Sequence, residues 1–118
     1  RMNGTERVHL VDQITVKPGQ GPAFLRAYME RYVPGAQARG LHLEQRWVTP
    51  PLWLDDQSNT LIFIWSLRGA QGFWAMSYQG RQDPALEDWW WNQAQTMIES
   101  RQRFIAGELD DLASLAAV

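Results

Sequence analysis

Two side chains near the N-terminus, those of His9 and Asp12, have the chemical types that proton transfer needs. A histidine can serve as general acid or base near neutral pH, so His9 is a candidate catalytic residue. The alternative is a hydrogen-bonded histidine in an interface, because no motif fixes a partner for its second ring nitrogen. Asp12 alternates with the apolar residues Leu10 and Ile14, where a carboxylate would be a buried base unless it is paired. In the structural alternative, a backbone bulge at Asp12 and Gln13 turns the carboxylate outward.

The remaining polar residues do not form the pattern of a metal site. His42, Glu44 and Arg46 alternate along residues 41–49, and we expect a polar stripe that faces solvent or a second subunit; a functional site is the alternative. The sequence has two histidines and no cysteine, and the histidines are not spaced as a pair of zinc ligands on one helix. Haem would need an axial ligand, for which His9 and His42 are the available histidines. We therefore expect no metal and no cofactor, with haem as the alternative.

The sequence contains seven tryptophans, more than the core of a small domain absorbs easily. Three of them, residues 89–91, are adjacent on a predicted helix and point about 100° apart, so they cannot all face one sheet. The surplus aromatic side chains either line a ligand cavity or anchor a dimer. We expect a cavity, because Trp65 should point from a central strand towards the helix that carries Phe73 and Trp74. The candidate ligand-binding residues are Trp65, Phe73, Trp74, Tyr78 and Trp90.

These side chains need a sheet and covering helices to position them. The strongest element is the apolar run at residues 59–67, which has the composition of a buried central strand. A helix should begin at Pro22 and be weakened or ended by Pro34–Gly35, and another should begin at Pro84 after Asp83 as N-cap. The other predicted elements are strands at residues 8–16, 41–49 and within 102–108, a short helix at 70–78 that ends near Gly80, and a terminal helix or tail at 109–118.

This order predicts an α+β fold of the ferredoxin-like βαββαβ type, with an antiparallel sheet and helices on one face. The first and third strands should lie in the middle of the sheet. The helices can cover only one face, and Val11, Ile62 and Ile64 belong to the other. Monomers rarely expose an apolar patch of that size, so we expect a homodimer that packs sheet against sheet.

Length and composition predict a single domain spanning residues 1–118. Residues 1–6 are expected to be disordered or left over from expression, because Arg1 precedes Met2. The net charge of −2 and the absence of a basic run argue against nucleic acid as a partner. No apolar stretch approaches the roughly 20 residues that span a membrane, and the absence of cysteine fits a reducing compartment. We expect a cytoplasmic protein that binds a small hydrophobic or aromatic ligand.

Several marks together resemble the dimeric α+β barrel superfamily, which holds antibiotic-biosynthesis monooxygenases, stress-responsive barrel proteins and NIPSNAP-like proteins. The resemblance covers nearly the whole chain. Its marks are the first strand with Val16-Lys17-Pro18-Gly19, a helix with Phe24-Leu25 and Tyr28, a strand pair, and Trp90 before residues 101–104.

The resemblance implies several possible chemistries. The superfamily includes cofactor-free oxygenases acting on polycyclic phenols, polyketide cyclases, lactone isomerases and haem enzymes. A polyketide cyclase of this group is similar in having a histidine in the first strand and a tyrosine in the first helix, which His9 and Tyr28 match. Its histidine near the second helix has no counterpart between residues 70 and 88, which weakens a cyclase interpretation.

The leading hypothesis is therefore a small cofactor-independent enzyme that performs a monooxygenase-like oxidation of a flat hydrophobic or aromatic molecule. His9, Asp12 and Tyr28 would transfer protons, and Trp65, Trp74 and Tyr78 would wall the pocket. One alternative is a non-catalytic ligand-binding or interaction module. Another is a polyketide cyclase or isomerase, which needs the same parts.

Overall fold

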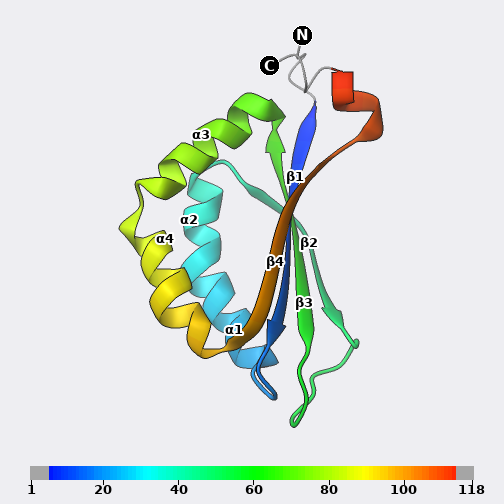
Figure 1. Cartoon of the computed structure of the whole chain (residues 1–118), viewed down its shortest axis with the longest axis vertical. Helices are drawn as coiled ribbons and strands as arrows, with labels where there is room; N and C mark the ends of the chain where they lie inside the picture. Colours follow the sequence, from blue (N-terminus) through cyan, green and yellow to red (C-terminus); the bar gives the residue numbers. More distant parts are fainter. Residues whose placement is uncertain (1–5, 114–118) are drawn as a thin grey trace.

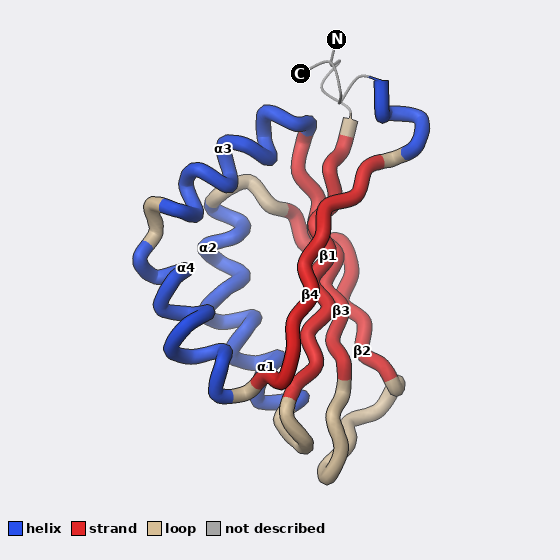
Figure 2. Tube along the Cα trace, viewed as in Figure 1, coloured by secondary structure: helices blue, strands red, loops and turns tan. Residues whose placement is uncertain are grey.

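The computed structural model describes residues 6–113 and contains a four-stranded antiparallel sheet with a helical layer on one face (Figures 1 and 2). The strand order is β2-β3-β1-β4, so the first and third strands are central, as predicted. The ferredoxin-like arrangement expected from the sequence is confirmed. The strands are β1 (Arg7–Val16), β2 (His42–Thr49), β3 (Thr60–Arg68) and β4 (Ile98–Gly107).

The helical layer consists of three helical stretches. The first comprises α1 (Gly21–Ala27), a π-helical turn (Tyr28–Tyr32) and α2 (Val33–Ala38). After β3 come α3 (Gly69–Arg81) and α4 (Pro84–Asp88), which continues into a π-helical turn (Trp89–Gln93) and a 3₁₀ turn (Ala94–Thr96). The side chain of Asp83 accepts a hydrogen bond from the Ala85 N–H at 3.0 Å, which is the predicted N-cap.

The first helical stretch does not end at Pro34–Gly35 but runs on to Ala38. Proline lacks a donor and its ring crowds the carbonyl one turn earlier, which disfavours a regular α-helix there. The chain adapts by widening the preceding turn, in which the N–H of Val33 donates to the carbonyl of Tyr28. Tyr28 and Tyr32 remain buried, so the widened turn keeps both rings on the face that covers the sheet.

Strand β2 differs from its predicted alternation because it contains a bulge. Leu43 lies opposite Trp65, whereas Gln45 lies opposite Ile64, which leaves Glu44 as an extra residue. The residues after it change face. Arg46 therefore lies on the helix-covered side, and Trp47 lies on the open side instead of beside Leu43.

Two predicted boundaries also move. Helix α3 extends through Gly80 to Arg81, and β4 begins at Ile98, four residues before the predicted range. The earlier start of β4 brings Arg101 into the strand. Two aligned arginines, Arg101 and Arg103, therefore point from β4 towards the helical layer, on the same face as Asp12.

Two predictions concern the ends of the chain: disorder or an expression remnant at residues 1–6, and a terminal helix or tail at residues 109–118. Residues 1–5 and 114–118, on which those predictions also fall, lie outside the described residues. Glu6 is buried, and its carbonyl accepts a hydrogen bond from the N–H of Gly69 at 2.9 Å. A 3₁₀ turn (Leu109–Asp111) follows β4, and Leu109 is exposed.

The core lies between the sheet and the helical layer and is rich in aromatic rings. Tyr28 stacks on Phe63 with 3.9 Å between ring centroids, and Phe24 and Trp89 lie within 6.4 Å of the Tyr28 ring by the same measure. Trp65 and Phe63 have no exposed surface. Part of the aromatic surplus noted in the sequence therefore fills the core.

Candidate functional site

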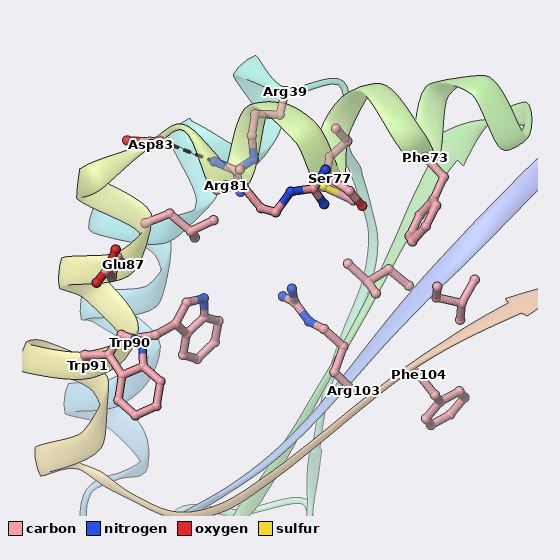
Figure 3. Close-up of a pocket in the computed structure, with 15 residues that line it drawn as sticks. Arg39, Phe73, Ser77, Arg81, Asp83, Glu87, Trp90, Trp91, Arg103 and Phe104 are labelled. Atoms are coloured by element: carbon pink, nitrogen blue, oxygen red, sulfur yellow. Dashed lines mark ion pairs between the residues drawn. The ribbon is translucent and has the colours of Figure 1, made fainter.

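A cavity of about 830 Å³ opens between the helical layer and the strands β1 and β4 (Figure 3). Its volume falls in the range of small-molecule sites. Strand β4 is exposed along nearly its whole length, because it is an edge strand with one uncovered face and α3 and α4 curve away from the other face (Figure 1). Apolar and aromatic side chains form much of the wall: Leu10, Phe73, Met76, Leu86, Trp90, Trp91 and Ile105. Polar side chains complete it: Arg39, Ser77, Arg81, Asp83, Glu87 and Arg103. Phe104 also borders the cavity, but its side chain points to the open face of the sheet.

Beside the cavity, the carboxylate of Asp12 is completely buried and receives four hydrogen bonds. Arg103 donates from Nε at 2.9 Å and from Nη2 at 2.6 Å, which is a bidentate pair. Arg101 donates from Nε at 3.3 Å, and the hydroxyl of Tyr28 donates at 3.4 Å. The register of β1 runs without a shift through Asp12, so no bulge turns it outward. Asp12 is thus the paired carboxylate, held inside by two guanidinium groups.

Two tyrosines and a tryptophan extend this network into the core. The indole N–H of Trp65 donates to the hydroxyl of Tyr28 at 3.0 Å, and Arg103 Nη2 donates to the hydroxyl of Tyr32 at 2.8 Å. Burial raises the pKa of Tyr28 well above its ordinary value, and the charge of Asp12 raises it further. Tyr28 is therefore a protonated donor at neutral pH and has no exposed surface through which it could meet a ligand.

The two arginines on β4 differ in the direction in which their surroundings shift the pKa. Burial acts to lower the pKa of Arg103, but the hydrogen bonds and charge of Asp12 outweigh it and raise that pKa above its ordinary value. Burial and the neighbouring Arg103 lower the pKa of Arg101. The Arg101 guanidinium lies 3.6 Å from the centroid of the Trp90 ring, a cation–π contact. Arg103 is the member of the pair that lines the cavity.

A third arginine, Arg39, follows α2 and forms the far side of the cavity (Figure 3). Its side chain is only 7% exposed, and its Nη1 lies 3.5 Å from a carboxylate oxygen of Asp83. Its Nε is buried without a hydrogen-bond partner in the described part of the chain. A buried donor of this kind is uncommon, because leaving it unsatisfied costs free energy.

The structure places the three predicted catalytic residues away from the cavity surface. His9 lies on the open face of the sheet, with Nε2 3.8 Å from a carboxylate oxygen of Glu108. Asp12 and Tyr28 contact each other, but both are sealed in the interior. Their contact with the cavity is indirect, through Arg103.

The five predicted ligand-binding residues divide between the cavity and other places. Phe73 and Trp90 line the cavity. Trp65 is buried in the core, while Trp74 and Tyr78 are 63% and 60% exposed on the outer side of α3. The wall expected from Trp65, Trp74 and Tyr78 is therefore not the wall of this cavity. The rings of Tyr28 and Tyr32 pack against the Trp65 ring, so Trp65 does not reach the cavity under α3.

The cationic side chains of the cavity were missed because their signal is not local. Arg101 and Arg103 alternate on one face of β4, but the predicted strand began too late to include both. Arg39 directly follows α2 and Arg81 is the last residue of α3, and both are ordinary surface residues by pattern alone. Asp12, alone among apolar neighbours, was the available hint that a cationic partner must lie on an adjacent strand.

In residues 6–113, no set of three or more histidine or acidic side chains is grouped so that it could hold a metal ion. Within the same residues, no helix combines the length and apolar character needed to cross a membrane.

No protein-family model matches the sequence, and no curated protein matches it significantly. Solved structures do match. A NIPSNAP family protein of unknown function from Agrobacterium tumefaciens superposes with a TM-score of 0.69 at 12% identity, covering 92% of each chain. An uncharacterised NIPSNAP domain protein from Burkholderia xenovorans gives 0.67 at 14% identity, covering 84% of this chain and 91% of that one.

A third similar structure carries a suggested activity. It is a candidate antibiotic biosynthesis monooxygenase from Nitrosomonas europaea, with a TM-score of 0.58 at 18% identity, covering 92% of this chain and 95% of that one. Identities this low establish shared architecture and nothing finer. The chain thus has the α+β fold of NIPSNAP proteins and antibiotic-biosynthesis-monooxygenase-like proteins, which confirms at the level of fold the resemblance drawn from its sequence.

Proposed function

We propose that this chain is a small enzyme that binds a flat hydrophobic or aromatic molecule in the cavity and oxidises it with dioxygen, without a tightly bound cofactor. The observation that carries the proposal is the cavity itself, about 830 Å³ in volume, with an apolar wall and the anchored Arg103 guanidinium. Such a space matches the shape and polarity of an aromatic ligand. The candidate monooxygenase with the same fold makes oxidation the first reaction to test.

The chemistry requires the substrate to supply all the electrons. In a balanced form, an activated methylene group becomes a carbonyl, while dioxygen provides that carbonyl oxygen and one molecule of water. The reaction begins with the transfer of a proton from the substrate to solvent water at the open side of the cavity, which leaves an electron-rich enolate or phenolate. A guanidinium group in an apolar cavity favours that anion over its neutral acid. Asp12 and Tyr28 act in this proposal as positioning residues that hold Arg103.

One observation favours a second function, non-catalytic ligand binding. Asp12 and Tyr28 are sealed from the cavity, and His9 lies on the opposite face of the sheet. Of the carboxylates that line the cavity, Asp83 is paired with Arg39, and Glu87 is exposed at the rim. A binding module needs no proton acceptor, so this arrangement suits it as well.

An oxygen electrode can distinguish the enzyme from the binding module by measuring oxygen uptake in the presence of a polycyclic phenol or anthrone. We expect saturable uptake by the wild-type chain. Ser77→Trp fills the cavity from α3, so we expect kcat/KM to fall about tenfold or more. Gln79→Trp adds the same ring at an exposed position of the same helix and should change kcat/KM less than about twofold.

Tryptophan fluorescence, measured with the same compounds, decides what a negative result means. One possible outcome is that the compounds quench the fluorescence, that Ser77→Trp weakens this quenching while Gln79→Trp does not, and that no oxygen is consumed. That outcome would establish the binding module and refute the enzyme. The absence of both quenching and uptake would remove the cavity as a site for such molecules.

We also propose that a second copy of the chain covers the open face of the sheet. Ile64 of β3, Val11 of β1 and Phe104 of β4 lie directly opposite one another in register and form an apolar row across three strands. Trp47 of β2 adds a ring that is 51% exposed on the same face. An apolar row of this kind is typical of a surface that is buried in an assembly.

Analytical ultracentrifugation tests this homodimer directly. The wild-type chain should sediment as a dimer at micromolar concentration, and Ile64→Lys should sediment as a monomer, because the new charge would be buried without a partner. Gln37→Lys, on the exposed side of α2, should leave the dimer intact. A wild-type chain that stays monomeric at micromolar concentration would refute the proposal.

A further inference from the structure

We infer that the cavity takes its ligand as an anion: a flat apolar body carrying a carboxylate that Arg103 and Arg39 hold. The inference rests on the proposed binding of flat hydrophobic molecules and adds the charge of the molecule that is bound. Four features carry it: the balance of buried charge, the free edge of Arg103, the unsatisfied Nε of Arg39, and the apolar surface beside them.

The buried network beside the cavity has one positive charge too many. Asp12 is one carboxylate facing two guanidinium groups, and Tyr28 contributes a neutral hydroxyl. The side chains of Arg101 and Arg103 are 27% and 29% exposed, so water compensates the surplus only in part. The whole chain carries a net charge of −2, so a positive cavity is a local feature and not a general property of the chain.

Charges elsewhere in the lining do not remove this surplus. Arg39 pairs with Asp83, and the exposed Arg81 and Glu87 have opposite signs. The sum over these four side chains is therefore zero. The surplus lies at Arg101 and Arg103, and an anion in the cavity would neutralise it.

The geometry of Arg103 leaves one edge of its guanidinium available. Nε and Nη2 bond Asp12, and Nη2 also bonds the hydroxyl of Tyr32. Nη1 makes no hydrogen bond within the described residues. Figure 3 shows the side chain reaching from β4 into the cavity, towards Arg39 and Arg81. A guanidinium fixed on one side and open on the other is a preorganised donor for a carboxylate.

Arg39 supplies the second donor. Its side chain is almost fully buried, it lines the same cavity, and its Nε has no acceptor in the described part of the chain. A ligand oxygen would satisfy this donor and recover the cost of its burial. Leu10, Trp90 and Ile105 provide apolar surface in the same cavity for the rest of the molecule. A small inorganic anion could not use that surface, so the lining fits an aromatic carboxylate.

The test compares two probes of the same shape, 2-naphthoate and its neutral amide, 2-naphthamide, by isothermal titration calorimetry. We expect the wild-type chain to bind the carboxylate about tenfold more tightly or better. The preference should shrink to within about twofold in Arg103→Gln and fall by at least about threefold in Arg39→Gln. Arg26→Gln, which removes an exposed charge on α1, should keep it.

Arg103→Gln also leaves Asp12 with one arginine, so its folding must be checked by circular dichroism. The double variant Asp12→Asn/Arg103→Gln removes both charges and should fold with the same loss of preference. Equal binding of the two probes by the wild-type chain would overturn the inference while leaving the proposed function standing. Failure of both probes to bind would overturn the inference, while the proposed function would still be decided by the measurements with polycyclic phenols and anthrone. A preference that survives in the folded Arg103 variants and in Arg39→Gln would also refute the assignment.

Discussion

Asp12→Ala is expected to lower the free energy of unfolding by about 3 kcal/mol, the low end of the range for breaking a buried ion pair. The substitution leaves two guanidinium groups without their carboxylate and Tyr28 without its acceptor. The loss should not reach the top of that range, because Arg101 and Arg103 are 27% and 29% exposed and can turn towards solvent. Urea denaturation followed by circular dichroism measures it.

Two variants show whether the effect comes from the charge. Asp12→Asn keeps an acceptor for the hydroxyl of Tyr28 but cannot neutralise an arginine, so its loss should be intermediate, about 2 kcal/mol. Asp56→Ala removes an exposed carboxylate from the β2–β3 loop and should change stability by less than about 0.5 kcal/mol. A loss below about 1 kcal/mol for Asp12→Ala would mean that the network contributes little to folding.

The sheet was predictable because its signal is local and repeats. Residues 8–16 alternate, and residues 59–67 are apolar on both faces, so their central positions follow from the periodicity of a strand and the need for burial. The helix starts were predictable for a similar reason: Pro22 and Pro84 occupy positions where a helix tolerates or favours proline.

The departures from prediction have physical causes that act at a distance. Glu44 becomes a bulge because β2 must keep its pairing with β3, and no residue type in β2 announces that shift. Pro34 does not end its helix, because the buried contacts of Tyr32, Val33 and Ala36 outweigh the loss of one hydrogen bond. Tertiary packing decides these cases, and sequence periodicity does not record it.

The cavity depends on the distance between the helices α3 and α4 and the edge strand β4. The pattern of residues within a single element does not determine that distance. Whether Trp74 or Phe73 faces inward changes with a rotation of α3 of about 100°, the angle between neighbouring helical residues. Both residues were equally good candidates by type. The partner of Asp12 was likewise undetermined, because Arg103 is opposite it only once β1 and β4 are paired in register.

The tryptophans provide the second large expected effect. Trp65→Ala should lower the free energy of unfolding by about 3–5 kcal/mol, the usual cost of deleting a large buried aromatic ring. Trp65 has no exposed surface, its ring centroid lies 5.9 Å from that of Tyr32, and its indole N–H donates a hydrogen bond to the hydroxyl of Tyr28. Trp65→Phe refills most of the space without the donor, so its loss should be smaller, about 1–2 kcal/mol. Urea denaturation again gives the values.

Trp74→Ala is the matched control, because it deletes the same ring from a position that is 63% exposed. We expect a change in stability within about 0.5 kcal/mol and an unchanged affinity for 2-naphthoate, since Trp74 does not line the cavity. If Trp74→Ala instead abolished binding of the probe while the chain stayed folded, the ligand would lie on the outer side of α3. The wall predicted from the sequence would then replace the cavity as the site, and the role given to Arg103 would fail with it.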